Sequence, residues 1–395
     1  MIDACYVCAS SDLTTFLLRP DSVVNLNTLH PDRAAAVAAE RVDLELAICN
    51  RCESILNRRF DFSKLEYARN YDTSTPASEY FEDYMRDLIL FLVKERRMVA
   101  RRVLEIGSGK GAFLKLLVSL TDPLTSAVGI DESYDGPPSL YDGRLEFRRR
   151  RYGDLESTPD ADVVLLRHVL CQAGDPMAVL RPLRKALSRE SVRIYFETPS
   201  TENILEEVLF TEICVERSSY FTVRNAHAMF HEAGFDVIDR PLRLFSGQYF
   251  LLECAPSQGT PRGAAGETVI PAATTYQARE RARIAEWRRT IEDAGRHCGV
   301  AIWGAGTKGA SLVNHVDPRG ELIDVVVDRN ARKIGHFVAG TGHPIVAPEE
   351  VAARGIGIIF VMNANYLEEM RAQMSTLAPN VILRPPIGAS ESLVS

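Results

Sequence analysis

The chain has 395 residues, which is enough for two or three domains that each bury their own core. Hydrophobic residues make up 46% and charged residues 25% of the chain, an ordinary balance for a water-soluble protein. The formal net charge of -7 argues against a nucleic-acid partner, and no apolar stretch is long enough to span a membrane. The first residues, MIDACYVC, lack the basic and apolar regions of a signal peptide, so we expect a cytoplasmic enzyme.

Two short cysteine pairs stand near the N-terminus, Cys5-x-x-Cys8 and Cys49-x-x-Cys52. Each pair places two thiolates on a tight turn, and two such turns supply the four sulfur ligands of tetrahedral Zn²⁺. Unrelated pairs of buried free cysteines are the alternative, and a redox role is disfavoured because neither pair follows a strand and opens a helix. We predict a structural zinc-binding domain over residues 1–62, since four sulfur ligands leave no open position for catalysis.

An aromatic-rich segment follows this domain, and its tyrosines, including Tyr67, Tyr80 and Tyr84, suggest a helical lid before the next strand. Aromatic residues at helical spacing usually belong to a core. Tyr71 lies instead in the irregular sequence NYDTSTPAS. We therefore predict that Tyr71 faces a ligand.

The stretch RRVLEIGSGKGAFLKLL, residues 101–117, has the order strand, glycine turn, helix. Gly107, Gly109 and Gly111 lack side chains, so the backbone there can approach a nucleotide closely. Dinucleotide enzymes and class I S-adenosylmethionine (SAM) methyltransferases both use this arrangement. Glu105, two residues before the first glycine, favours the methyltransferases, whose motif is similar to E-x-G-x-G-x-G.

A sheet is expected around this motif, with the cofactor residues at the ends of its strands. The predicted strands cover residues 126–131, 144–148, 162–167, 192–197, 235–238 and 248–253. Asp131 is suited to the ribose hydroxyls, Asp154 to the adenine amine, and His168 faces the presumed cleft. The last two strands form a closing antiparallel pair, which distinguishes the methyltransferase sheet from a purely parallel dinucleotide fold. We predict an α/β, Rossmann-like SAM-binding domain over residues 63–254.

Residues 255–275, rich in Pro, Gly, Ala and Thr, are predicted to be a linker, and residues 276–395 a second Rossmann-like α/β domain. A helix is expected over 276–297, before the loop Gly304-x-Gly306-x-x-Gly309. With Asp328 at the end of the next strand, this pattern is typical of dinucleotide sites and leaves an NAD-dependent oxidoreductase as an alternative. Lys308 inside the loop suits a phosphate, so we favour substrate anchoring.

In this order the segments resemble the family of sugar C-methyltransferases that act on keto-sugars attached to a nucleoside diphosphate. The resemblance rests on the paired cysteines, the pattern YxxxYDxSxxxS over residues 67–78, EIGSGKG, HVL after the fourth strand, and DRNARKIG in the last domain. It implies SAM and Zn²⁺ as cofactors and a small-molecule acceptor from natural-product biosynthesis. It also implies acceptor contacts from the glycine loop at Gly306 and from Lys308, Asp328 and Asn363.

One stretch departs from the family, whose catalytic sequence is similar to I-Y-H-E-H-x-S-Y-F; this chain has ICVERSSYF over residues 213–221. Glu216 and Tyr220 match, but Arg217 replaces the histidine that the resemblance implies as base, and arginine cannot be a neutral base near pH 7. Arg217 is suited instead to hold a phosphate or carboxylate, or to polarise an oxyanion. Our first candidate for the base is His168, followed by Glu216 and Glu197. C-methylation is implied by the resemblance, and O-methylation remains an alternative.

Overall fold

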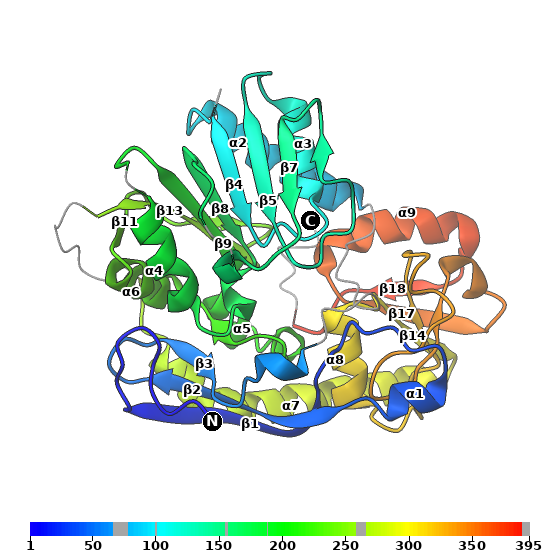
Figure 1. Ribbon diagram of the computed structural model, residues 1–395. Helices are drawn as coiled ribbons and strands as arrows, with labels where there is room; N and C mark the ends of the chain where they lie inside the picture. The colour runs from blue at the N-terminus through cyan, green and yellow to red at the C-terminus, as the bar shows by residue number, and fades with distance from the viewer. Residues whose placement is uncertain (66–77, 99–100, 155–156, 188, 258–265, 389–395) are drawn as a thin grey trace.

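The computed structural model describes residues 1–65, 78–98, 101–154, 157–187, 189–257 and 266–388. These residues form three sheets with helices between and around them. In Figure 1 the largest sheet lies above, the N-terminal sheet lies along the lower edge, and the C-terminal sheet lies at the lower right. The α/β class predicted from the sequence is confirmed.

The N-terminal sheet is antiparallel and has the order β1-β2-β3-β10. Its strands are β1 (Leu13–Val23), β2 (Arg41–Cys49), β3 (Ile55–Asn57) and β10 (Ser219–Tyr220). The Ala-rich helix α1 (Arg33–Val37) begins after Asp32, whose side chain accepts a hydrogen bond from the Ala35 amide. The fourth strand comes from the altered catalytic stretch, so this stretch is part of the N-terminal sheet.

The largest sheet carries the predicted nucleotide motif. Its strands are β4 (Arg102–Ile106), β5 (Ser126–Ile130), β6 (Ser139–Leu140), β7 (Leu145–Arg148), β8 (Val163–Arg167), β9 (Arg193–Pro199), β11 (Phe235–Val237), β12 (Leu242–Leu244) and β13 (Tyr249–Pro256). Their order is β11-β13-β9-β8-β4-β5-β7-β6, with β12 paired to β13. The strands from β9 to β7 are parallel, whereas β13 is antiparallel to both β9 and β11. The predicted antiparallel closing pair is confirmed.

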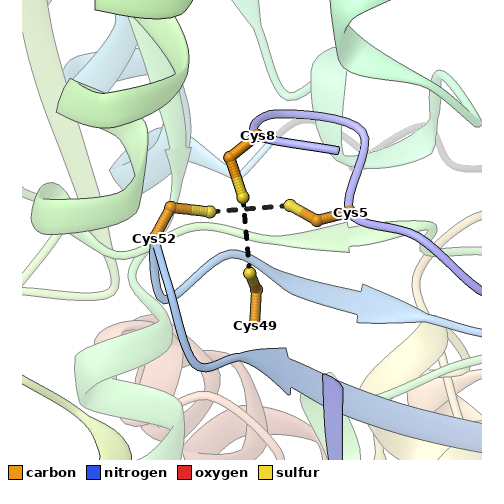
Figure 2. Close-up of side chains that lie close together, drawn as sticks. All are labelled: Cys5, Cys8, Cys49 and Cys52. Atoms are coloured by element: carbon orange, nitrogen blue, oxygen red, sulfur yellow. Dashed lines mark hydrogen bonds between the residues drawn. The ribbon is translucent and has the colours of Figure 1, made fainter. Parts of the chain in front are cut away.

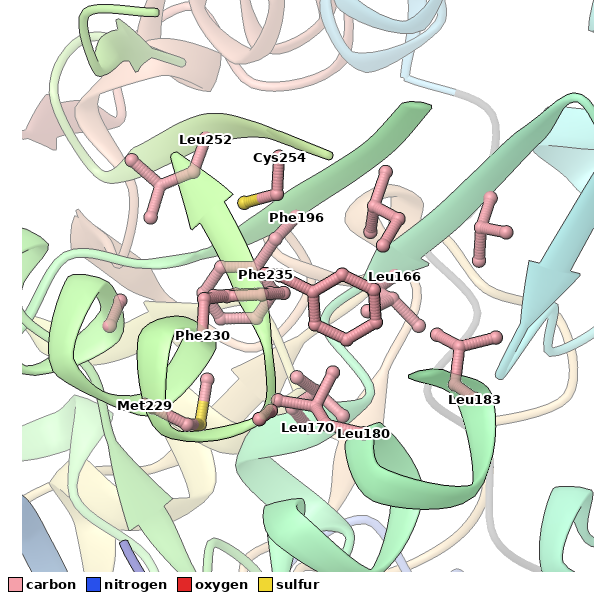
Figure 3. Close-up of a cluster of buried hydrophobic side chains, with 14 of the residues drawn as sticks. Leu166, Leu170, Leu180, Leu183, Phe196, Met229, Phe230, Phe235, Leu252 and Cys254 are labelled. Carbon is pink, nitrogen blue, oxygen red and sulfur yellow. The ribbon is translucent and has the colours of Figure 1, made fainter. Parts of the chain in front are cut away.

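Helices cover both faces of this sheet. One face packs against α2 (Glu79–Lys94) and α3 (Ala112–Leu120), and the other against α4 (Pro176–Ala186) and α6 (Val223–Glu232). Figure 3 shows the second interface, where Leu166 and Phe196 from the strands meet Leu180 and Phe230 from the helices. Each such side chain contributes about 2 kcal/mol by leaving water. The sheet is therefore a rigid platform for the residues at its strand ends.

The C-terminal sheet is parallel and has the order β16-β15-β14-β17-β18. Its strands are β14 (Gly299–Trp303), β15 (Val325–Val327), β16 (Ile345–Val346), β17 (Ile356–Val361) and β18 (Ile382–Arg384). Helices α7 (Ile270–Gly295) and α8 (Thr307–Val316) cover one face, and α9 (Leu367–Leu377) covers the other. The glycine loop thus joins β14 to α8, as predicted.

Two boundaries differ from the sequence-based expectation. Helix α7 begins at Ile270, six residues before the predicted start, and β13 continues to Pro256. The early start of α7 has a structural reason, because Glu53 accepts hydrogen bonds from the Thr268 hydroxyl and the Val269 amide. Over the described residues, no helix combines the length and the apolar character needed to cross a membrane.

Candidate active site

The carboxyl ends of β4, β5, β8 and β9 meet at one edge of the largest sheet, where the glycine loop lies. Gly107, Gly109 and Gly111 have φ of 77°, 53° and 76°, a left-handed conformation that favours glycine. A Cβ added to Gly107 would lie 2.5 Å from the Val169 side chain, and a Cβ added to Gly111 would lie 2.3 Å from the Phe147 ring. A Cβ on Gly109 would meet no described atom within 4 Å. The outer side of the loop is therefore open to a ligand.

Asp131 directly follows β5 and is bound to this loop. Its Oδ2 accepts a hydrogen bond from the Gly109 amide at 2.8 Å, and its Oδ1 accepts one from the Ser133 amide at 2.7 Å. Oδ1 also accepts a hydrogen bond from the Ser133 hydroxyl at 2.6 Å, whereas Oδ2 keeps a further lone pair that can accept a ligand hydroxyl. Asp154 ends the short helix η2 (Tyr152–Asp154), but its side chain is not among the described atoms, and Tyr71 lies outside the described residues.

Glu197, on β9, is a fully buried carboxylate that gathers three side chains. Its Oε1 accepts a hydrogen bond from the Tyr84 hydroxyl at 2.6 Å and lies 2.9 Å from Nε2 of His168. Its Oε2 accepts a hydrogen bond from Nε of Arg167 at 2.6 Å. Burial raises the pKa of Glu197, but the charge of Arg167 and the hydrogen bonds from His168 and Tyr84 outweigh burial and hold the pKa well below its usual range. Glu197 is therefore an anion that orients its neighbours.

Glu105, on β4, is a second buried carboxylate, and its Oε1 lies 3.6 Å from Nη1 of Arg167. Burial raises the pKa of Glu105 to about 7, although Arg167 opposes this shift. Its Oε2 is buried and has no hydrogen-bond partner among the described residues. An unpaired buried acceptor beside an open glycine loop fits a ligand that carries a cationic donor, such as the ammonium group of SAM.

His168 follows β8 with φ of 53°, and its amide is hydrogen-bonded to the Glu197 carbonyl oxygen. The imidazole lies edge-on to the Tyr249 ring with 4.6 Å between centroids, and the side chain is 33% exposed. Its Nε2 faces Glu197, so a neutral ring donates from Nε2 and leaves the lone pair on Nδ1. The imidazole is therefore both held in place and accessible, as a general base must be.

Glu216 and Tyr220, two other catalytic candidates, form hydrogen bonds with backbone groups. The Glu216 carboxylate accepts a hydrogen bond from the Leu26 amide at 3.1 Å, and the side chain is buried. The Tyr220 hydroxyl bonds to the amide and the carbonyl oxygen of Cys214, and burial raises its pKa. These contacts hold Glu216 to the segment after β1 and Tyr220 to the local backbone, and a catalytic role for either residue stays a prediction.

Arg217 contacts a carboxylate that the sequence analysis did not single out. Its Nη1 donates to the Glu212 carbonyl oxygen at 3.0 Å, and its Nη2 lies 3.7 Å from Oε2 of Glu212. The other oxygen of Glu212 lies 2.8 Å from Nζ of Lys308. Burial raises the pKa of Glu212, but Lys308 and Arg217 outweigh it, so the pKa is lowered. The structure thus brings Arg217 and Lys308 to one carboxylate.

Gln248 joins Lys308 to Asn363. Its Oε1 accepts a hydrogen bond from Nζ of Lys308 at 2.8 Å, and its Nε2 donates to Oδ1 of Asn363 at 3.0 Å. Gln248 directly precedes Tyr249, whose ring touches His168. Gln248 therefore links Lys308 to Asn363, and His168 lies near the same group, since it helps to lower the pKa of Glu212, the carboxylate partner of Lys308.

Asp328 is hydrogen-bonded to the glycine loop around Gly306. The two oxygens of Asp328 accept hydrogen bonds from the amides of Ala305 and Asn330, both at 2.8 Å. Nζ of Lys333 donates to the Ala305 carbonyl oxygen at 3.2 Å. Both oxygens of Asp328 therefore accept hydrogen bonds from the protein's own backbone. Through the Ala305 amide, Asp328 fixes the conformation of the glycine loop.

The four N-terminal cysteines converge, as Figure 2 shows. Sγ of Cys5 lies 3.5 Å from Sγ of Cys52, and Sγ of Cys8 lies 3.5 Å from Sγ of Cys49. All four sulfur atoms lie within 4.8 Å of one another. Four thiolates at about 2.3 Å from a central ion require such spacing, so the cluster is consistent with zinc binding.

Two family models match the chain. Residues 77–240 match the model described as a methyltransferase domain, and residues 270–380 match the one described as a C-methyltransferase C-terminal domain. The chain is therefore a SAM-dependent methyltransferase. It is 24% identical over 400 residues to C-methyltransferase NovU of Streptomyces niveus, covering 93% of this chain and 91% of that protein. These findings confirm the resemblance to C-methyltransferases and weigh against the NAD-dependent alternative.

Solved methyltransferase structures are similar to about half of the chain. One is the dimethyltransferase RosA of Streptomyces davawensis, at 22% identity and a TM-score of 0.36, with 45% of this chain and 55% of that one covered. Another is magnesium protoporphyrin IX methyltransferase of Synechocystis PCC 6803, at 15% identity and a TM-score of 0.37, with 50% and 96% covered. The chain thus spans about half the length of RosA.

Five residues that the structure brings to this site were not predicted as site residues: Tyr84, Arg167, Glu212, Gln248 and Tyr249. Arg167 had a visible signal, because a charge that ends the apolar run DVVLL needs a buried partner. Tyr84 was assigned to the core, and it does pack there while its hydroxyl reaches Glu197. Glu212 and Gln248 had no signal in the sequence, since their partners lie on other elements.

Proposed function

We propose that the chain methylates a carbon atom of a keto-sugar, or a sugar-like natural-product precursor, that is carried on a nucleotide. The observation that carries the proposal is the position of His168 beside Tyr249 and of Lys308 beside Gln248, two consecutive residues where β13 begins. This arrangement supports a site that contains both a proton acceptor and a cation for phosphate. The printed name of the NovU relative and the C-methyltransferase C-terminal match support carbon as the methylated atom.

SAM, when bound, supplies an electrophilic methyl group. We propose that Gly107, Gly109 and Gly111 admit it to the backbone, that Asp131 accepts its ribose hydroxyls, and that Glu105 binds its ammonium group. Tyr71 and Asp154 remain proposed contacts from the sequence. The buried wall around Glu105 and Arg167 excludes water from that end of the site.

His168 is the proposed general base. Nδ1, the ring nitrogen that does not face Glu197, takes the proton from the carbon beside the keto group. The resulting imidazolium is stabilised by the Glu197 carboxylate at 2.9 Å, while Arg167 and Tyr84 keep that carboxylate ionised and oriented. Arg217 remains the candidate for polarising an oxyanion or holding an anionic group. O-methylation would use the same base on a hydroxyl.

The proposal is tested with purified protein, SAM and a panel of nucleotide-linked keto-sugars. We expect formation of S-adenosylhomocysteine (SAH) and of a product whose new methyl group is bonded to carbon by NMR. In D₂O without SAM, the enzyme should also exchange the proton on the carbon beside the keto group for deuterium, because the general base removes that proton. A methyl group on oxygen without such exchange would favour the O-methyltransferase alternative, and absence of transfer to every member would refute the acceptor class.

Replacing Asp131 with alanine is expected to weaken SAH binding by about 100-fold. The change removes a charged acceptor for ribose and also the anchor of the Gly109 amide, each worth roughly 1.5–3 kcal/mol. Isothermal titration calorimetry with SAH measures the effect. Asp122→Ala, in the exposed turn before β5, is the matched control and should bind SAH as the parent does. Unchanged binding by Asp131→Ala would remove this residue from the cofactor site.

Replacing Lys308 with glutamine is expected to raise KM for the nucleotide-sugar by about 10-fold to 100-fold, because one charge-assisted contact to phosphate is lost. The Kd for SAH should not change, since Lys308 comes from the C-terminal domain. Steady-state kinetics and calorimetry measure the two constants separately. Lys185→Gln, on the exposed side of α4, controls for the change in net charge. Equal losses in both constants would argue against an acceptor-specific role.

We also propose that Cys5, Cys8, Cys49 and Cys52 hold one Zn²⁺ ion. The donor set of four sulfur atoms fits a closed structural site, in which the ion stabilises the fold and takes no part in methyl transfer. Two backbone hydrogen bonds close each of the turns that begin at Cys5 and Cys49, and a bound ion would join these two turns to each other.

A further inference from the structure

Two cations from different parts of the chain share one carboxylate near His168. Nζ of Lys308 lies 2.8 Å from Oε1 of Glu212, and Nη2 of Arg217 lies 3.7 Å from Oε2. The three side chains are 25%, 12% and 15% exposed for Lys308, Arg217 and Glu212, so they are shielded without being sealed. Charges in this setting interact more strongly than on an open surface.

Each cation has a second partner that carries no charge. Lys308 donates to the side-chain oxygen of Gln248 at 2.8 Å, and Arg217 donates to the main-chain oxygen of Glu212 at 3.0 Å. Both cations therefore keep their orientation if the Glu212 carboxylate turns away. The Glu212 carboxylate contributes a negative charge to this arrangement, but neither cation depends on the carboxylate alone for its position.

The local charge is not balanced by Glu212 alone. Two full positive charges face one carboxylate, and Lys308 lies in the first turn of α8, where the helix adds partial positive charge. Nε of Arg217 is buried and has no hydrogen-bond partner among the described residues. An anion with more than one charge and several acceptor oxygens would satisfy the two cations better than a single carboxylate does.

We propose that Lys308 and Arg217 form a receptor for the diphosphate of the acceptor, and that Glu212 is an internal occupant which the diphosphate displaces. The identity of the acceptor as a nucleoside diphosphate derivative rests on the proposed function. Glu212 is ionised in the absence of the acceptor, because its two cations lower its pKa despite burial. It therefore competes with any incoming anion, and singly charged anions gain little by replacing it.

This arrangement makes Glu212 a specificity residue. Carboxylates and other singly charged metabolites meet a site that is already paired, whereas a diphosphate supplies enough charge for both Lys308 and Arg217. Arg217 stands where the related sequences have the histidine that the resemblance implies as base, so the same substitution that removes that base adds the second cation. Removing the competing carboxylate should therefore strengthen anion binding, whereas most mutations in a binding site weaken it.

The experiment measures the Kd of uridine diphosphate and thymidine diphosphate by calorimetry in the presence of SAH. Glu212→Gln is expected to bind the tighter of the two about tenfold more strongly than the parent, because a like charge has been removed from the site. Lys308→Gln is expected to bind it about tenfold more weakly. Glu321→Gln, which makes the same charge change beyond the other end of α8, should equal the parent.

Two controls show whether a change in diphosphate binding comes from a folding defect: the Glu212→Asp variant, and SAH binding by every variant. Glu212→Asp keeps the competing charge and is expected to stay within about threefold of the parent Kd, and every variant should bind SAH as the parent does. Diphosphate binding by Glu212→Gln that is equal to or weaker than that of the parent, with SAH binding intact, would overturn the proposal. So would failure of both diphosphates to bind any variant.

The proposed function fails in a different way. If Glu212→Gln binds diphosphate more tightly but neither it nor the parent transfers a methyl group to a nucleotide-sugar, then the receptor stands and the acceptor assignment falls. Methyl transfer to a sugar without a diphosphate, with no gain in Glu212→Gln, would retain the enzyme class and remove the receptor.

Discussion

Replacing His168 with asparagine is expected to lower kcat for methyl transfer by about 10²–10⁴-fold, the usual contribution of a positioned general base. Asparagine keeps a polar side chain that can still contact Glu197, but it cannot accept a proton near neutral pH. The Kd for SAH should remain within about twofold of the parent. Single-turnover transfer and SAH calorimetry separate chemistry from cofactor binding.

Two further variants make the test of His168 specific. His231→Asn alters an exposed histidine on α6 and should leave kcat unchanged. Glu197→Gln removes the charge that stabilises the imidazolium, so it should reduce kcat. If His168→Asn retains more than a tenth of the parental rate, the base is another group and His168 has a structural role.

Replacing Cys49 with serine is expected to remove the proposed zinc ion and to lower the first unfolding transition by about 10 °C. Loss of one of four thiolates weakens a structural zinc site severely, and the free energy of metal binding is part of the free energy of folding. Zinc content by mass spectrometry and thermal unfolding by calorimetry measure the two effects. We expect about one zinc ion per parental chain, as one four-thiolate site requires.

The control for this prediction is Cys298→Ser, which makes the same chemical change in the C-terminal domain, where the thiol bonds to the Ala294 carbonyl oxygen. It should retain zinc and unfold at the parental temperature to within a few degrees. A parental chain that binds no zinc after reconstitution would contradict the metal assignment. Equal effects of Cys49→Ser and Cys298→Ser would show that thiol loss acts through packing.

The fold was predictable because its signals are local. Apolar runs such as DVVLLR predicted buried strands, and the glycines after β4 and β14 predicted the two loops where strands turn into helices. The antiparallel closing pair was predicted because two strand-like segments come after Gly234, the glycine that ends the preceding helix. The extra turn at the start of α7 could not be predicted, because Glu53 from the N-terminal segment supports it.

The site was predictable only in part, since its contacts join distant segments. His168 and Glu197 were both candidates because they end neighbouring parallel strands, and the structure places them 2.9 Å apart. Glu216 and Tyr220 matched a motif, and the motif did not predict their hydrogen bonds to Leu26 and Cys214, which lie elsewhere on the backbone. The contact of Glu212 with Lys308 depends on how η4 (Phe210–Glu212) packs against α8, which no local pattern encodes.

The pairing of β10 with β3 limits how the enzyme can be shortened. Ser219 and Tyr220 form their ladder with Leu56 and Ile55, and the first three strands cover an apolar cluster that reaches Tyr276. A chain truncated before residue 58 would present an unpaired strand edge beside bare hydrophobic surface, a combination that promotes aggregation. Its SAM-binding fragment is therefore not an independent piece, and deletion of the amino-terminal 57 residues should yield insoluble protein.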